Sequence, residues 1–128
     1  MERLGFQDAA FLRLEAPDRP YHVGGLMVFA PPERAGRDYL RRLVRRVGEQ
    51  LPALDPVFRR QLDPAHPAAP RWIEASDIDP SRHLLHYALP QPGRMDDLLH
   101  LVSRAHERVL DRSGPLWEWH FIEGLPGG

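Results

Sequence analysis

The chain has 128 residues, of which 42% are hydrophobic and 9% aromatic, and this length suits one small domain or one lobe of a larger protein. A formal net charge of -1 gives no overall attraction to nucleic acid or to an anionic membrane. Cysteine is absent, which excludes disulfides, thiolate catalysis and thiolate metal sites. No stretch approaches the roughly 20 apolar residues that span a bilayer, and the N-terminal sequence lacks the pattern of a signal peptide.

The first predicted helix covers residues 5–15. Asp8 stands near its start, where a carboxylate is favoured by the positive end of the helix, and two nearby prolines end the helix. Its apolar positions fall on one face: Phe6, Ala9, Ala10 and Leu14. The helix therefore should pack this face against the rest of the protein.

Residues 21–30 are apolar on both faces and predict a buried strand, which Pro31 and Pro32 end. Val23, Gly24 and Gly25 lie inside it. Glycines within a strand indicate either a bulge in ordinary strand packing or a close approach by another backbone or a ligand.

A second helix is predicted at 37–51, with one apolar stripe. Its arginines lie away from that stripe: Arg41, Arg42, Arg45 and Arg46. We interpret them as the solvated face of an amphipathic helix. Contact with phosphate is the alternative, and the lack of interleaved aromatic residues argues against a nucleic-acid interface.

Short strands are predicted at 56–62, 71–75 and 81–90, followed by a helix over 94–114 and a last strand over 116–123. Trp117, Trp119 and Phe121 share one face of that last strand. Since its other face is also largely apolar, we expect an interior strand with partners on both edges. Mixed strands and helices predict an α/β or α+β fold, in which helices cover a mixed sheet.

The seven histidines invite a search for a metal site or an acid–base pair. His83 and His86 are three residues apart, so on a strand they would point to opposite faces, and no shared metal is expected. His120, within the last strand, is expected to be a hydrogen-bonded core residue. No GxSxG elbow and no phosphate-binding glycine loop occurs. The residues alone therefore reveal no reaction.

Three segments resemble one family. Gln7 to Phe29 contain a DAxFL helix followed by an HVG strand, Arg82 to Gly93 read RHLLHYALPQPG, and Leu101 to Gly128 include LDRSGPLWE. These segments are similar, in the same order, to motifs of the bacterial wax ester synthase/diacylglycerol acyltransferases. They cover about half of the chain. The three segments in this order are far more specific for the family than any one segment is alone.

The resemblance implies a lobe like that of chloramphenicol acetyltransferase, incomplete without the rest of the chain. Residues 1–128 would form most of the N-terminal lobe of a two-lobed enzyme, ending just before the family's HHxxxDG motif. The second histidine of that motif is the general base that activates a fatty alcohol or diacylglycerol to attack an acyl-CoA thioester. No residue of this chain receives a catalytic role. Neither a metal nor a cofactor is implied, and acyl-CoA is a co-substrate.

The same resemblance implies roles for residues of this chain. Val23, Gly24 and Gly25 would border the acyl or CoA path, and Asp8 would anchor the first helix unless it is a plain helix-start charge. The PLW motif would support the sheet beneath the catalytic loop: Pro115, Leu116 and Trp117.

The expected partners are acyl-CoA, the acceptor alcohol and the C-terminal part of the same enzyme, with no nucleic acid. The expected location is the cytoplasm, with peripheral contact to the inner membrane or to lipid inclusions. A lipid- or protein-binding module without catalysis is the alternative function.

Overall fold

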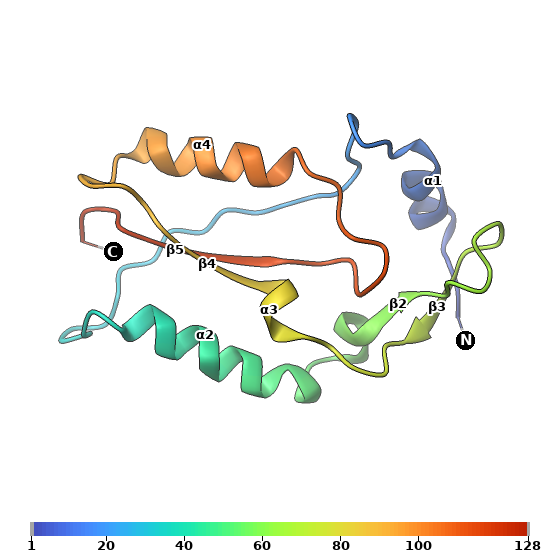
Figure 1. The fold of residues 1–128 in the computed structure, drawn as a ribbon, viewed down its shortest axis with the longest axis horizontal. Helices are drawn as coiled ribbons and strands as arrows, with labels where there is room; N and C mark the ends of the chain where they lie inside the picture. Colours follow the sequence, from blue (N-terminus) through green and yellow to red (C-terminus); the bar gives the residue numbers. More distant parts are fainter. Residues whose placement is uncertain (1, 128) are drawn as a thin grey trace.

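The computed structural model describes residues 2–127. Two long helices lie on opposite sides of a central pair of strands, and a small three-stranded sheet lies at the end of the molecule that holds the N-terminus (Figure 1). The elements are, in chain order, β1 (Glu2–Arg3), α1 (Phe6–Leu14), α2 (Tyr39–Gln50), η1 (Leu51–Ala53), η2 (Pro56–Arg59), β2 (Arg60–Leu62), β3 (Arg71–Glu74), α3 (Pro80–His83), β4 (Leu84–Ala88), α4 (Met95–His106) and β5 (Trp119–Glu123). The predicted class, strands and helices in one α/β fold, is confirmed.

The strands form two separate sheets. In the small sheet β3 lies between β1 and β2, and both pairs are antiparallel. In the central sheet β4 and β5 are parallel, with Leu84 opposite Trp119 and Ala88 opposite Glu123. A parallel pair needs a long crossover. Here the crossover contains α4, which therefore covers one face of the pair while α2 covers the other (Figure 1).

The buried core lies between the two long helices and β4. Its buried leucines come from η1 just after α2, from the start of β4 and the residue after its end, and from α4: Leu51, Leu84, Leu89 and Leu98. Gly48 lets α2 approach this layer, because a Cβ there would lie 3.6 Å from Leu84 and 3.5 Å from Pro80. The apolar stripe of α2 thus faces the sheet, as its sequence pattern predicts.

The predicted buried strand over 21–30 is wrong for this structure. The segment runs extended, as the light-blue trace of Figure 1, but it makes no ladder and most of it is exposed. Val23 is 89% exposed, Met27 75% and Phe29 74%. An apolar sequence favours a strand, but only hydrogen bonds to a neighbouring strand create one. No such neighbour exists among residues 2–127.

Four other predicted boundaries shift. The last strand begins at Trp119 and not at Leu116. The long helix ends at His106, so residues 107–114 form a loop instead of its last turns. The start of the predicted strand 81–90 is the short helix α3, because the Asp79 side chain caps it and Pro80 occupies its first turn. Asp55 and Pro56 likewise turn the start of the predicted strand 56–62 into a 3₁₀ helix. The strand β1 was not predicted, since two residues carry no readable pattern.

The apolar face predicted for the first helix is also only partly correct. The helix forms at Phe6–Leu14, yet Phe6 is 93% exposed and Leu14 48%. Its inner contacts are few, and one of them is the Phe11 ring beside Tyr21 at 5.9 Å between centroids. A polar contact to the helix, from Arg112, is described below.

Candidate functional site

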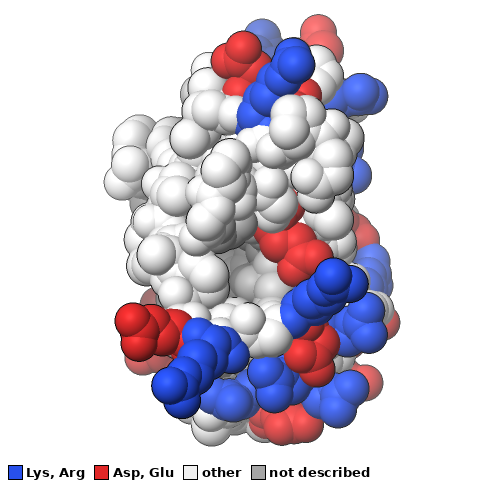
Figure 2. Space-filling model, turned by 90° about the vertical axis from the view of Figure 1, so that its left-hand side faces the viewer, with Lys and Arg blue, Asp and Glu red and all other residues white. Residues whose placement is uncertain are grey.

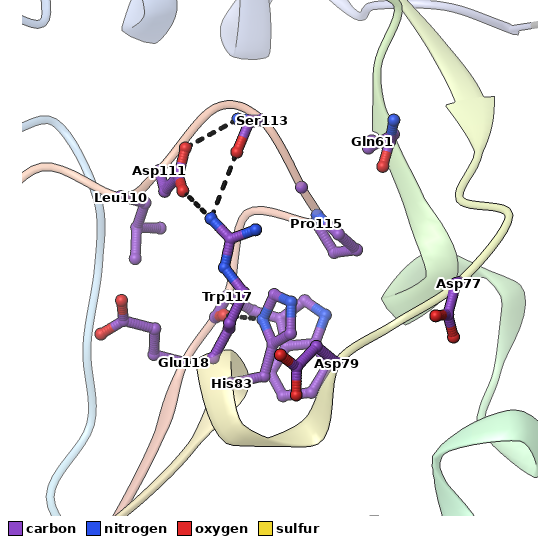
Figure 3. Close-up of a pocket in the computed structure, with 12 residues that line it drawn as sticks. Gln61, Asp77, Asp79, His83, Leu110, Asp111, Ser113, Pro115, Trp117 and Glu118 are labelled. Atoms are coloured by element: carbon purple, nitrogen blue, oxygen red, sulfur yellow. Dashed lines mark hydrogen bonds and ion pairs between the residues drawn. The ribbon is translucent and has the colours of Figure 1, made fainter.

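The loop between α4 and β5 meets α3 at a polar corner. A cavity of about 240 Å³ lies there. Its walls come from both motif segments and from the small sheet: Gln61, Asp77, Asp79, Arg82, His83, Leu110, Asp111, Ser113, Gly114, Pro115, Trp117 and Glu118 (Figure 3). The structure therefore brings together the RHLLHYALP and LDRSGPLW segments, whose contacting residues His83 and Trp117 lie 34 positions apart in the sequence.

His83 holds the PLW motif at two points. Its Nδ1 lies 2.8 Å from the backbone oxygen of Trp117, and its ring lies 4.5 Å from the Trp117 ring (Figure 3). A carbonyl oxygen only accepts, so Nδ1 carries the hydrogen and donates. His83 is buried, with 7% of its surface exposed. It stands at the C-terminal end of α3, so the capped turn at Asp79 fixes where the ring is placed.

Trp117 in turn contacts the 3₁₀ helix η2 (Pro56–Arg59). Its Nε1–H donates to the backbone oxygen of Phe58 at 2.8 Å, and its ring meets the Phe58 ring edge-on at 5.9 Å. The Trp119 ring lies 5.7 Å from Trp117, and the Phe121 ring lies 6.5 Å from Trp119. The three predicted aromatic rings therefore form one row, of which only Trp119 and Phe121 lie on the strand β5 itself. It starts at the corner and continues along β5.

Arg82 is one of the residues that line the corner cavity. Its guanidinium pairs with Asp111 and also donates to the Ser113 hydroxyl at 3.3 Å (Figure 3). The backbone N–H and the hydroxyl of Ser113, together with Arg82, hold the pKa of Asp111 below its usual range. The hydroxyl and backbone N–H of Ser81 lower the pKa of Asp79 in the same way. Both carboxylates are thus ionised and committed to partners near neutral pH.

The N-terminal segment is tied to the same loop. Arg112 donates to the backbone oxygen of Leu12 at 2.8 Å and to Glu15 at 3.2 Å. Glu15 also accepts from the backbone N–H of Tyr21 at 3.1 Å, and His22 Nε2 lies 2.8 Å from the backbone oxygen of Arg108. The loop 107–114 is consequently the centre of the polar contacts of α1. The sequence did not predict these contacts, although the LDRS motif contains Arg112 and the HVG motif contains His22.

The predicted site residues fall in three places. Pro115, which is buried, and Trp117 line the corner cavity, and half-buried Leu116 lies between them in sequence. Asp8 is exposed in the first turn of α1, and no side-chain hydrogen bond caps that helix. Val23, Gly24 and Gly25 lie on the extended segment, away from the corner.

The surroundings of the two glycines differ. A Cβ on Gly24 would meet the His106 ring at 3.4 Å, whereas a Cβ on Gly25 would meet nothing within 4 Å. The close approach of the extended segment to α4 thus explains why position 24 holds a glycine. Nothing within residues 2–127 explains Gly25.

The contacts at the corner are hydrogen bonds, an ion pair and ring contacts. Within residues 2–127, no group of three or more His, Asp or Glu side chains could hold a metal ion. His86 lies on β4, where it faces Glu123 at 3.4 Å, far from a shared site with His83 on α3. His120 contacts Glu118 at 2.9 Å, so the predicted hydrogen bond exists, while its buried Nδ1 has no partner among the described residues.

The fold and the PLW corner define the class of protein. Residues 4–128 match the family model of the wax ester synthase/diacylglycerol acyltransferase catalytic domain. The chain belongs to this family, as its motifs indicate.

Solved and curated relatives agree. The wax ester synthase/diacylglycerol acyltransferase of Marinobacter aquaeolei VT8 is 39% identical with a TM-score of 0.87, and the match covers 98% of this chain and 30% of that one. A protein of Mycobacterium tuberculosis named as a diacylglycerol O-acyltransferase is 43% identical over 94% of this chain and 27% of its own length. The O-acyltransferase WSD of Acinetobacter baylyi is 38% identical, over 94% and 25%. The chain thus spans about a quarter to a third of the length of these relatives.

Proposed function

We propose that residues 1–128 are most of the N-terminal lobe of a long-chain acyl-CoA:alcohol or diacylglycerol O-acyltransferase that makes wax esters, triacylglycerol or both. The observation that carries this is the corner at which His83 holds Trp117 of the PLW motif, in a chain that belongs to the acyltransferase family. In this proposal the corner fixes the orientation of β5 relative to the segment that carries the HHxxxDG motif. The chain itself supplies no catalytic base.

The direct test is acyl transfer by the full-length enzyme. Purified protein is mixed with a radiolabelled long-chain acyl-CoA and either a fatty alcohol or diacylglycerol, and the products are separated by thin-layer chromatography. Labelled wax ester or triacylglycerol supports the proposal. Release of free fatty acid alone, with every acceptor, would contradict it.

The remaining C-terminal part of the enzyme is proposed to complete the central sheet beside β5. Among residues 2–127, β5 has a partner only on the edge that faces β4. The segment 21–30 lies extended and unpaired, with large apolar side chains exposed. One further strand between these two would satisfy both, because each needs backbone partners that residues 2–127 do not offer.

Val23, Gly24 and Gly25 are proposed to border the path of the acyl chain or of CoA. Support comes from Gly25, whose position leaves open space where a side chain would stand, so an added side chain should not disturb this chain. Gly25→Val should lower kcat/KM for long-chain acyl-CoA and leave the midpoint of thermal unfolding unchanged. An unchanged kcat/KM across chain lengths would remove this assignment.

A cytoplasmic location, with peripheral contact to the inner membrane or to lipid inclusions, is also proposed. No helix within residues 2–127 combines the length and the apolar character needed to cross a bilayer. The proposed substrates have long acyl chains, which partition out of water at about 0.8 kcal/mol per methylene. Fractionation of cells that express the full-length enzyme tests this.

A further inference from the structure

The outer face of α2 carries a concentration of positive charge that the fold does not use. Four arginines and one glutamate give this helix a net charge of +3, whereas the whole chain carries -1, so the rest of the chain carries -4. All four arginines are exposed. Only Arg42 has a carboxylate partner among residues 2–127, Asp38 at 3.6 Å, and both side chains of that pair are more than half exposed.

These side chains point away from the protein because the opposite face of α2 packs on the sheet. Gly48 on that face is close to Pro80 and Leu84, and Leu51 just beyond the helix is 2% exposed. In Figure 2, which views the left-hand end of Figure 1, basic side chains gather along the lower rim, where α2 lies, with acidic side chains among them, and the left and centre of the view above them are largely uncharged. The four arginines therefore lie on the surface of the described part of the chain.

We infer that the α2 arginine face (Arg41, Arg42, Arg45 and Arg46) docks the enzyme on an anionic lipid surface. The inference rests on the proposed function. Long-chain substrates partition out of water into lipid surfaces, so an enzyme that uses them must bind at such a surface. Clusters of four to eight basic residues on an amphipathic helix are typical of binding to anionic lipid headgroups, with about 1 kcal/mol contributed by each.

The shape of the face favours a planar surface over a single small anion. The four side chains extend over about 7.5 Å of helix and lie in the open. Neither the corner cavity nor the shallow one beside His106 includes a residue of α2. A soluble phosphate or the phosphates of CoA would need such a pocket for more than loose attraction. Nucleic acid is disfavoured because the exposed positions of α2 carry only Arg, Glu and Gln, with no aromatic side chain to stack on bases.

The test is co-sedimentation of the full-length enzyme with vesicles of phosphatidylcholine alone or mixed equally with phosphatidylglycerol. The wild type should prefer the anionic vesicles, and added salt should weaken the preference. A triple variant removes the three arginines without a carboxylate partner: Arg41→Gln, Arg45→Gln and Arg46→Gln. By the contribution per residue, its binding to anionic vesicles should fall about 100-fold.

A matched control removes the same charge from exposed positions on α1, α4 and the following loop: Arg13→Gln, Arg104→Gln and Arg108→Gln. It should keep wild-type binding within a few-fold. Equal losses in both triple variants, no preference for anionic vesicles, or binding to DNA in place of vesicles would each overturn the inference.

Acyl transfer is measured in parallel with substrates dispersed in a nonionic detergent, which offers no anionic surface. Activity there should be the same in the wild type and both triple variants. Acyl-transfer activity without a preference for anionic vesicles would contradict this inference and leave the proposed function standing. A preference for anionic vesicles without acyl transfer would contradict the proposed function and not the docking of the α2 arginine face.

Discussion

His83 and Trp117 form a two-point clamp, with a hydrogen bond of 2.8 Å to the Trp117 backbone oxygen and rings 4.5 Å apart. The clamp joins the end of α3 to the residues that directly precede β5. A histidine pattern that at first invites a metal search is therefore a structural device. The hydrogen bond of the clamp is made by Nδ1, the ring nitrogen of His83 nearest the backbone.

Two substitutions of His83 distinguish the contribution of Nδ1 to stability from that of Nε2. The side-chain amide of Asn can donate from the position of Nδ1, whereas the amide of Gln reaches the position of Nε2. We expect His83→Gln to cost about 1–3 kcal/mol, because the Trp117 carbonyl loses its donor, and His83→Asn to cost less. Thermal unfolding of the full-length variants checks this order. Equal loss in both would show that the ring contact, and not the hydrogen bond, matters.

Trp117 contributes through its ring and through its N–H. Trp117→Ala should cost about 3–5 kcal/mol and lower the soluble yield more than it alters acyl-chain preference. Trp117→Phe keeps an aromatic ring but leaves the Phe58 carbonyl without its donor, at about 1 kcal/mol. Trp72→Phe is the control, because the Trp72 ring stacks under Arg60 without a hydrogen bond from its indole among the described residues. A soluble Trp117→Ala enzyme with changed chain-length selectivity would reverse the assignment.

Gly93 tolerates no side chain. Its φ is +76°, and a Cβ there would lie 1.7 Å from the backbone oxygen of Gly124, at the turn that follows β5. Gly93→Ala should therefore destabilise the protein by about 3 kcal/mol or more. Gly5→Ala is the control, since Gly5 has negative φ and no atom within 4 Å of the added carbon. Similar soluble yields for the two variants would contradict the close approach.

Asp111 should make the free energy of unfolding depend on pH in the acidic range. Its pKa is lowered by the backbone N–H and hydroxyl of Ser113 and by Arg82, so its contribution is complete above the ordinary Asp value of about 3.9. The contribution is lost as the pH falls through the lower folded-state pKa. Asp111→Asn should lower the unfolding midpoint slightly at pH 7, because the Arg82 pair is exposed, and the difference should shrink in acid. A difference that stays constant down to pH 2 would rule this out.

Completion of the sheet is testable by hydrogen exchange. In the full-length enzyme, backbone amides of β5 and of residues 21–30 should be protected on account of ladder partners outside residues 2–127. In a protein truncated after residue 128, protection of 21–30 should be lost while that of α4 remains. Fast exchange of 21–30 in the full-length enzyme would show that this segment is not a strand there either.

The sequence by itself determined much of this protein. Strong periodicity placed both long helices, because an apolar stripe at helical spacing specifies the same element wherever it packs. The alternation at Trp117, Trp119 and Phe121 gave the faces of the last strand, and the ordered motifs gave the family.

Only the tertiary structure decided which of these residues meet. The end of α4 at His106 and the clamp of His83 on Trp117 depend on contacts between distant segments, which no local pattern encodes. The unpaired state of 21–30 has the same cause: a strand is a relation between two segments, and the sequence of one segment cannot supply the other.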